Sequence, residues 1–146
     1  MTRPTSTPAP PIPWPDATRH AAFSRWIGSI APAHGLQLDS LAPASADASF
    51  RRYLRVQTRS GSCIVMDAPP PQEDVRPFVQ VAAWIGEAGL NGPRVLACDP
   101  VQGFVLLSDL GHALYLDELQ RCSAARAAAL MRDATTALLR WQQHTP

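Results

Sequence analysis

The amino-acid sequence predicts an α+β fold, in which one helix packs on a five-stranded antiparallel sheet. A further helix precedes the sheet, and C-terminal helices follow it. Residues 41–70 contain aromatic and β-branched segments separated by small polar turns, which is typical of a meander of strands. Residues 74–107 contain a segment with helical periodicity and then two strand-like segments joined by a short loop. Three meandering strands, one helix and a hairpin together make such a sheet.

The composition is that of a globular protein with a core of its own. Hydrophobic residues make up 46% of the 146 residues and charged residues only 17%. The net charge of +1 gives no electrostatic support for binding to nucleic acid or to an anionic membrane. The sequence has no lysine, so all 13 basic residues are arginines. Any contact to a phosphate group would therefore come from a guanidinium, a backbone N–H or a metal ion.

The cysteines and the apolar segments indicate a cytoplasmic protein. Cys63, Cys98 and Cys122 are odd in number and form no C-x-x-C motif, so we expect a reducing compartment, no disulfide and no structural zinc. Prolines interrupt the N-terminus where a signal peptide would need an apolar run. No apolar stretch approaches the roughly 20 residues that span a bilayer.

The N-terminal third of the chain predicts a tail, a helix and a first strand. Residues 1–15 contain six prolines and are expected to form a disordered, Pro-rich tail. Asp16 is placed to cap a helix whose apolar residues recur at helical spacing, and Pro32 and Gly35 are expected to end it. Residues 36–41 follow as the first strand.

The remaining elements follow from the same patterns. Strands are expected at residues 50–56, 63–66, 94–98 and 104–107. Asp74 is placed to cap the helix that packs on the sheet, and Gly89 follows its end. A short helix is expected at residues 113–119. Ser123 is placed to cap a final helix with one apolar face, consisting of Leu130, Met131, Ala134, Leu138 and Trp141.

Several consecutive segments then identify a family resemblance. They are SADASFRRYLRV (45–56), IVMDAPPPQED (64–74), PFVQVAAWIGEAGLNGPRVLACD (77–99) and GFVLLSDLG (103–111). In this order and spacing they resemble the N-terminal lobe of the aminoglycoside-phosphotransferase-like, protein-kinase-like superfamily. Within it, they are similar to bacterial kinases that phosphorylate N-acetylmuramate and N-acetylglucosamine at the anomeric position. The resemblance implies a kinase-like N-lobe over residues 16–111, and linker helices over 112–146 that lead toward a C-lobe.

The resemblance implies two segments that contact ATP. In such kinases the loop between the first two strands closes over the nucleotide phosphates, and small residues let backbone N–H groups approach them. That loop would be Ser45, Ala46, Asp47, Ala48 and Ser49. On composition alone it is an ordinary hairpin turn. The hinge that reads the adenine edge would be Leu107, Ser108, Asp109 and Leu110. The Asp109 side chain is also suited to capping the following turn.

The resemblance leaves the phosphate-facing charge open. The third strand of such kinases carries a basic residue, but Asp67 stands near that position here and a carboxylate cannot pair with phosphate. Arg51, Arg52 and Arg55 on the neighbouring strand are the candidates, and alternation places Arg52 on the opposite face from the other two. We favour Arg52; the alternative is that all three are solvated. The helix that usually supplies a glutamate partner offers no convincing match.

The chain contains no catalytic or metal-binding motif of this superfamily. None of the four histidines begins an H-x-D motif, and no metal-binding aspartate on a strand follows. The resemblance places those groups, and the ligands of Mg, in a C-lobe. We therefore expect a truncated kinase fragment that is inactive alone and that works with ATP and an amino sugar of cell-wall recycling in the complete enzyme.

A second hypothesis has a different kind of partner. A degenerate, non-catalytic lobe would act as a protein-binding module and would associate through the exposed C-terminal helix.

Overall fold

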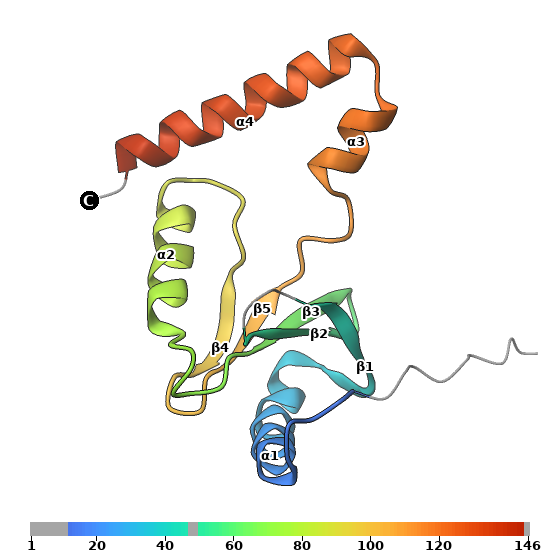
Figure 1. Cartoon of the computed structure of the whole chain (residues 1–146), viewed down its shortest axis with the longest axis vertical. Coiled ribbons are helices and arrows are strands. Elements are labelled where there is room, and N and C mark those ends of the chain that lie inside the picture. Colours follow the sequence, from blue (N-terminus) through green and yellow to red (C-terminus); the bar gives the residue numbers. More distant parts are fainter. Residues whose placement is uncertain (1–11, 47–49, 145–146) are drawn as a thin grey trace, which may run out of the picture. The chain divides into compact units, whose positions relative to one another are not determined.

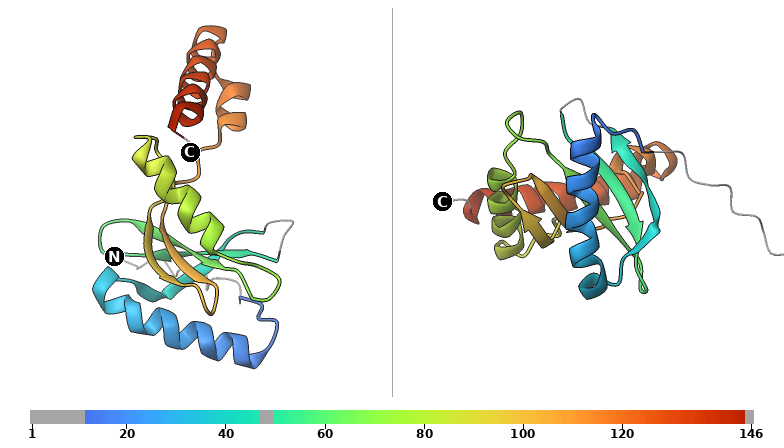
Figure 2. Two further views of the ribbon diagram at one scale, coloured as in Figure 1. Left: turned by 90° about the vertical axis from the view of Figure 1, so that its left-hand side faces the viewer. Right: turned by 90° about the horizontal axis from the view of Figure 1, so that it is seen from below.

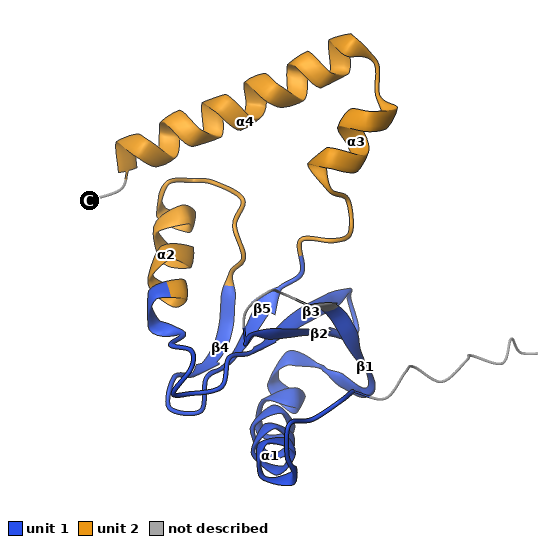
Figure 3. Cartoon of the chain, viewed as in Figure 1, with its two compact units in different colours: residues 1–77, 95–109 blue, residues 78–94, 110–146 orange. Residues whose placement is uncertain are grey.

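The computed structural model describes residues 12–46 and 50–144, which divide into two compact units (Figure 3). The first unit joins residues 1–77 with 95–109, and the second joins residues 78–94 with 110–146. The chain finally leaves the first unit after Asp109, two residues before the boundary expected at residue 111. By its contacts, the segment 78–94 groups with the C-terminal helices.

The first unit contains a five-stranded sheet in the order β1-β2-β3-β5-β4, with every neighbouring pair antiparallel (Figure 1). The strands are β1 (Gln37–Ala46), β2 (Arg52–Gln57), β3 (Ser62–Asp67), β4 (Val95–Asp99) and β5 (Phe104–Ser108). The predicted α+β class, with its antiparallel sheet of five strands, is confirmed.

Helix α1 (Ala17–His34) lies along one face of this sheet (Figure 2). Asp16 caps it as expected, because its carboxylate accepts a hydrogen bond from Arg19 N at 2.8 Å. The expectation that Pro32 helps to end the helix is wrong, since Pro32 lies inside the last turn. The helix ends instead at Gly35, whose φ of 62° suits a residue without a Cβ.

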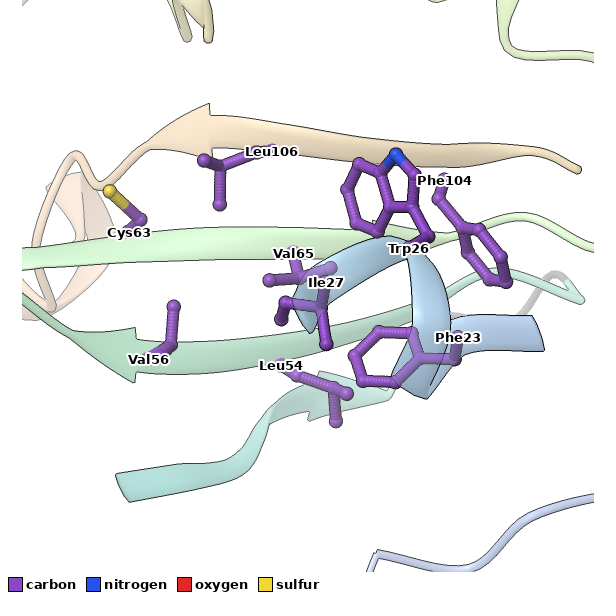
Figure 4. Packing of buried hydrophobic residues seen from close by; sticks show 9 residues of the cluster. All are labelled: Phe23, Trp26, Ile27, Leu54, Val56, Cys63, Val65, Phe104 and Leu106. Carbon is purple, nitrogen blue, oxygen red and sulfur yellow. The ribbon is translucent and has the colours of Figure 1, made fainter. Parts of the chain in front are cut away.

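The core of the first unit forms between α1 and the sheet (Figure 4). Leu54, Val65 and Leu106 lie opposite one another across β2, β3 and β5, and form a row on one face. The side chains of Phe23, Trp26 and Ile27 project from α1 onto the same face. Within the first unit, the core contacts come from α1, the helix that precedes the sheet.

The opposite face of the sheet is also buried. Met66, Val105 and Leu107 alternate with the core row and are at most 4% exposed. A sheet buried on both faces explains why β3 and β5 are continuous apolar runs that do not alternate with polar residues.

Strand β1 is longer than expected, because it reaches Ala46 and does not end at residue 41. It is an edge strand, where proline at position 43 is tolerated since one side has no partner strand. Its pairing with β2 shifts register twice, and Ser40 Oγ accepts a hydrogen bond from Gln57 N near the first shift. Pairing with β2, which the sequence pattern does not reveal, therefore sets its length.

Residues 12–15 of the expected N-terminal tail lie within the described part of the chain. Ile12 and Trp14 pack against the core cluster, and the Trp14 ring stacks on His20 at a centroid distance of 4.9 Å. The rest of the expected tail, residues 1–11, lies outside the described residues.

The second unit is helical. It contains most of α2 (Arg76–Glu87), with α3 (Tyr115–Arg121) and α4 (Ala124–His144). The expected caps are present: Asp74 accepts a hydrogen bond from Arg76 N at 3.0 Å, and Ser123 accepts one from Arg126 N at 3.3 Å. Gly89 follows α2 with a φ of 67°, as its position predicted.

Candidate functional site

Each of the three arginines of the β2 segment forms an ion pair with a carboxylate. Arg51 pairs with Glu73, Arg52 with Asp67 and Arg55 with Asp109, and their side chains are 30%, 26% and 18% exposed. The alternative that all three are solvated is therefore wrong. Arg52 lies on the α1 face of the sheet, since it shares that face with Leu54. Arg55 alternates to the other face, as predicted, whereas Arg51 precedes the first residue of β2.

Arg55 holds the residue that follows β5. Its Nε donates to Asp109 Oδ2 at 2.6 Å and its Nη2 donates to Oδ1 at 3.1 Å, which makes a bidentate pair. Ser62 Oγ, from the start of β3, donates to the same carboxylate at 2.6 Å. The hydrogen bond to Asp109 raises the pKa of Arg55 above its ordinary value. Burial, and secondarily the nearby Asp109 charge, raise the pKa of the Cys63 thiol.

Arg52 belongs to a separate, buried cluster. Asp67 is fully buried between Arg52 and Arg19, and accepts hydrogen bonds from both guanidinium groups. Arg52 also donates to the Pro13 carbonyl and stacks over the Trp14 ring at 4.4 Å from its centroid. These contacts join α1 and the N-terminal segment to the end of β3.

Arg51 immediately precedes the first residue of β2. Its Nε donates to Glu73 Oε2 at 2.9 Å, and Glu73 comes from the turn that precedes α2. Burial alone would lower the pKa of Arg51, but the hydrogen bond and the charge of Glu73 outweigh it and raise that pKa.

Part of the loop expected to contact phosphate lies outside the described residues. Ser45 and Ala46 belong to β1, where they pair with Tyr53 and Arg52 of β2, and so are strand residues at the start of the loop. Asp47, Ala48 and Ser49 lie outside the described residues.

The residues expected to form the hinge are placed at the end of β5. Leu107 is buried in the sheet, Ser108 pairs with Cys63 as the last residue of β5, and Leu110 is 57% exposed. Asp109 lies between them with its carboxylate bound to β2 and β3. The structure thus brings Arg55 to the expected hinge and places Arg52 on the other face of the sheet.

The sequence of this chain matches a known protein family over most of its length. The sequence profile described as "Phosphotransferase enzyme family" matches residues 40–146, which include β2, β3, β5 and the segment after β5. The chain belongs to this phosphotransferase family.

Three relatives of this phosphotransferase share the name "N-acetylmuramate/N-acetylglucosamine kinase". The protein from Pseudomonas aeruginosa is 50% identical over 88% of this chain and 39% of its own length. The protein from Pseudomonas putida is 47% identical over 71% of this chain and 30% of its own. The protein from Neisseria meningitidis is 35% identical over 86% of this chain and 36% of its own. The matches thus span only 30% to 39% of the length of these three curated relatives.

Sequence reasoning missed two partners in this phosphotransferase. Neither Arg19 nor Glu73 was singled out from the sequence. A possible signal for Arg19 was its place near the apolar stripe of α1, four residues before Phe23. Glu73 carried no comparable signal, because its partner Arg51 is 22 residues away across a turn.

Two further findings concern metal ions and membranes. Among residues 12–46 and 50–144, no group of three or more His, Cys, Asp or Glu side chains could hold a metal ion. No helix in the described part of the chain is long and apolar enough to cross a membrane.

Proposed function

We propose that this chain is the nucleotide-binding lobe of an ATP-dependent phosphotransferase that acts on an amino sugar, N-acetylmuramate or N-acetylglucosamine, in cytoplasmic cell-wall recycling. The observation that carries the proposal is the 50% identity, over 88% of the chain, to a relative named as a kinase for these two sugars. The sheet order and the linker after β5 support it, because they supply an N-lobe of the expected kind.

In this proposal the adenine base lies against the segment Leu107–Leu110. Backbone groups of the segment would read the base edge, since the Asp109 carboxylate is already bound by Arg55 and Ser62. The loop Ser45–Ser49 would close over the phosphates, with β1 and β2 fixing its two ends.

We assign the phosphate-facing charge to Arg51 in preference to Arg52. Arg52 is directed toward α1 and is held by Asp67 and the Pro13 carbonyl. Arg51 immediately precedes β2, close to the end of the same loop, and Glu73 Oε2 accepts a hydrogen bond from its Nε at 2.9 Å. An arginine oriented by a glutamate provides the forked donor geometry that suits phosphate oxygens.

The described residues do not fit a Mg site by themselves, because no group of three or more His, Cys, Asp or Glu side chains among them could hold a metal ion. We propose that this chain binds and orients ATP, and that transfer needs groups which its 146 residues do not supply, an H-x-D aspartate among them.

The test compares the chain with a chimera that continues it with the remaining part of the Pseudomonas aeruginosa relative. We expect calorimetry to show ATP binding by the chain alone without turnover. We expect the chimera to release ADP only when N-acetylmuramate or N-acetylglucosamine is present. Activity on aminoglycosides or small alcohols alone would refute the substrate but not the reaction class. No ATP binding by either protein would refute the proposal.

The assignment of Arg51 has its own variant pair in the chimera. Arg51→Gln should raise the KM for ATP about tenfold, because a charge-assisted hydrogen bond is lost. Arg59→Gln is the matched control, since Arg59 is exposed in the β2–β3 turn. A normal KM for Arg51→Gln with a raised KM for Arg52→Gln would reverse the assignment.

One observation favours a second function, that of a non-catalytic protein-binding module. Large apolar side chains of the second unit are more than half exposed, namely Leu114, Leu116, Met131, Leu138 and Leu139. This function predicts saturable binding of a protein partner that Leu138→Glu abolishes, together with no ATP binding even by the chimera.

A further inference from the structure

The carboxylate of Asp109 connects three strands at the point where the chain leaves the sheet. Asp109 follows the last residue of β5, Ser62 is the first residue of β3, and Arg55 lies within β2. Asp109 accepts two hydrogen bonds from Arg55 and one from Ser62, at 2.6–3.1 Å. We call these three residues the linker clamp.

Burial makes the linker clamp a stiff connection. The Asp109 side chain is 7% exposed and that of Arg55 is 18% exposed, so water competes weakly for their hydrogen bonds. A bidentate arginine–carboxylate pair also fixes the orientation of the carboxylate, which a single contact does not. The position of the Asp109 backbone is thereby tied to β2 and β3 in addition to β5.

The clamp coincides with a boundary in the chain. Asp109 is the last residue of the first compact unit. Leu110 is 57% exposed, and Gly111 adopts a φ of 89° that side-chain-bearing residues rarely adopt. The contacts from Arg55 and Ser62 therefore anchor the backbone at the residue where the first unit ends.

We propose that Arg55, Asp109 and Ser62 are positioning residues for nucleotide binding. The clamp holds the backbone of Ser108 and Asp109 in the conformation that reads the base edge. This inference rests on the proposed function, in which that backbone contacts the adenine. None of the three side chains needs to touch the nucleotide. A backbone segment that is ordered before the ligand arrives loses less conformational entropy on binding, so the clamp strengthens affinity.

The Asp67 cluster provides a matched control for general loss of stability. Asp67 is also a buried aspartate held by arginines, but it lies on the α1 face at the end of β3, where Arg19 and Arg52 bind it. Asp67→Asn and Asp109→Asn are the same chemical change at two buried ion pairs. Only the second one disturbs the segment after β5.

The experiment measures ATP affinity and linker mobility for these variants of the 146-residue chain. Calorimetry is carried out at a temperature where circular dichroism shows each variant to be folded. Hydrogen exchange of the peptide that covers residues 107–111 is measured without nucleotide. We expect Asp109→Asn to weaken ATP binding about tenfold and to speed exchange in that peptide, within the range by which a coupled residue alters binding. Asp67→Asn should keep the affinity within about twofold.

Different outcomes would refute the positioning role of the clamp and the proposed function. Unchanged ATP affinity in Asp109→Asn, or an equal loss in Asp67→Asn, would overturn the positioning role. If the wild-type chain and the chimera do not bind ATP, the proposed function fails. Exchange at residues 107–111 then still decides whether the clamp orders the linker. If Asp109→Asn does not fold, Arg55→Lys takes its place, because it keeps the charge and removes the bidentate geometry. It should show the same loss of affinity, and normal affinity in that variant would overturn the inference.

Discussion

Asp67→Asn is expected to destabilise the first unit strongly, because it removes the negative charge that two arginines share. In the folded protein Asp67 is fully buried, and Arg19 and Arg52 donate to its two oxygens. An asparagine keeps one acceptor oxygen but turns an NH₂ group toward the other guanidinium. One donor would then face another donor, and two partly buried positive charges would lose their counter-ion.

The structure limits the size of this effect. Removing one partner of a buried ion pair costs about 3–5 kcal/mol. The lower end applies here, since Arg19 keeps its 2.7 Å hydrogen bond to the Gln102 carbonyl and its position over the Phe104 ring. Arg52 is also 26% exposed, so water stabilises part of its charge. We therefore expect a loss of about 3 kcal/mol in the free energy of unfolding.

Urea denaturation followed by tryptophan fluorescence measures this loss, because Trp14 and Trp26 lie next to the cluster or in the core. With a slope of about 2 kcal/mol per molar, the midpoint should fall by about 1.5 M. Asp74→Asn is the control, since Asp74 is 51% exposed in its pair with Arg76 and asparagine is an equally good helix cap. A loss below about 1 kcal/mol for Asp67→Asn would refute the reasoning that burial makes this cluster important.

Two further predictions concern pH and backbone geometry. The pKa of the Cys63 thiol is raised in the folded protein by burial and the Asp109 charge, so the unfolded chain releases this proton first as pH rises. The stability that this thiol contributes is thus complete below the unfolded pKa of about 8.5 and is lost above it. From pH 7 to 10, urea midpoints should fall less steeply for Cys63→Ala than for the wild type. Identical slopes for the two proteins would contradict this. Gly103→Ala should cost at least about 2 kcal/mol, because Gly103 has a φ of 72° and an added Cβ would overlap the Ala68 carbonyl oxygen. Gly28→Ala meets no atom within 4 Å in α1 and should instead add about 0.5–1 kcal/mol, as thermal unfolding of both variants would show.

Much of the fold could be predicted from the sequence because its signals are local. The apolar runs that became β3 and β5, the Asp16 cap of α1 and the glycine after α2 each depend on residues within one or two turns of chain. The length of β1 could not be predicted this way. Residues 42–46 are small or proline and show no strand pattern, and their conformation follows from pairing with β2.

The candidate site was predictable in its location but not in its contacts. The segment Leu107–Leu110 was identified by resemblance, and the structure places it at the end of β5. The partners of the β2 arginines were not predictable, because 15 to 54 residues separate each arginine from its carboxylate. The placement of Arg52 and Arg55 on opposite faces was predictable, since it follows from strand geometry alone.

The sequence by itself determined the class of the fold, the order of its elements and the family, because periodicity, caps and consecutive motifs are read along the chain. Only the tertiary structure decided that α1 covers a face of the sheet, that Asp67 is a structural counter-ion for Arg19 and Arg52, and that Asp109 is held by Arg55 and Ser62. The physical reason is that burial turns distant, ordinary charged residues into specific pairs. A charge removed from water must find a partner, and only the folded chain determines which partner is near.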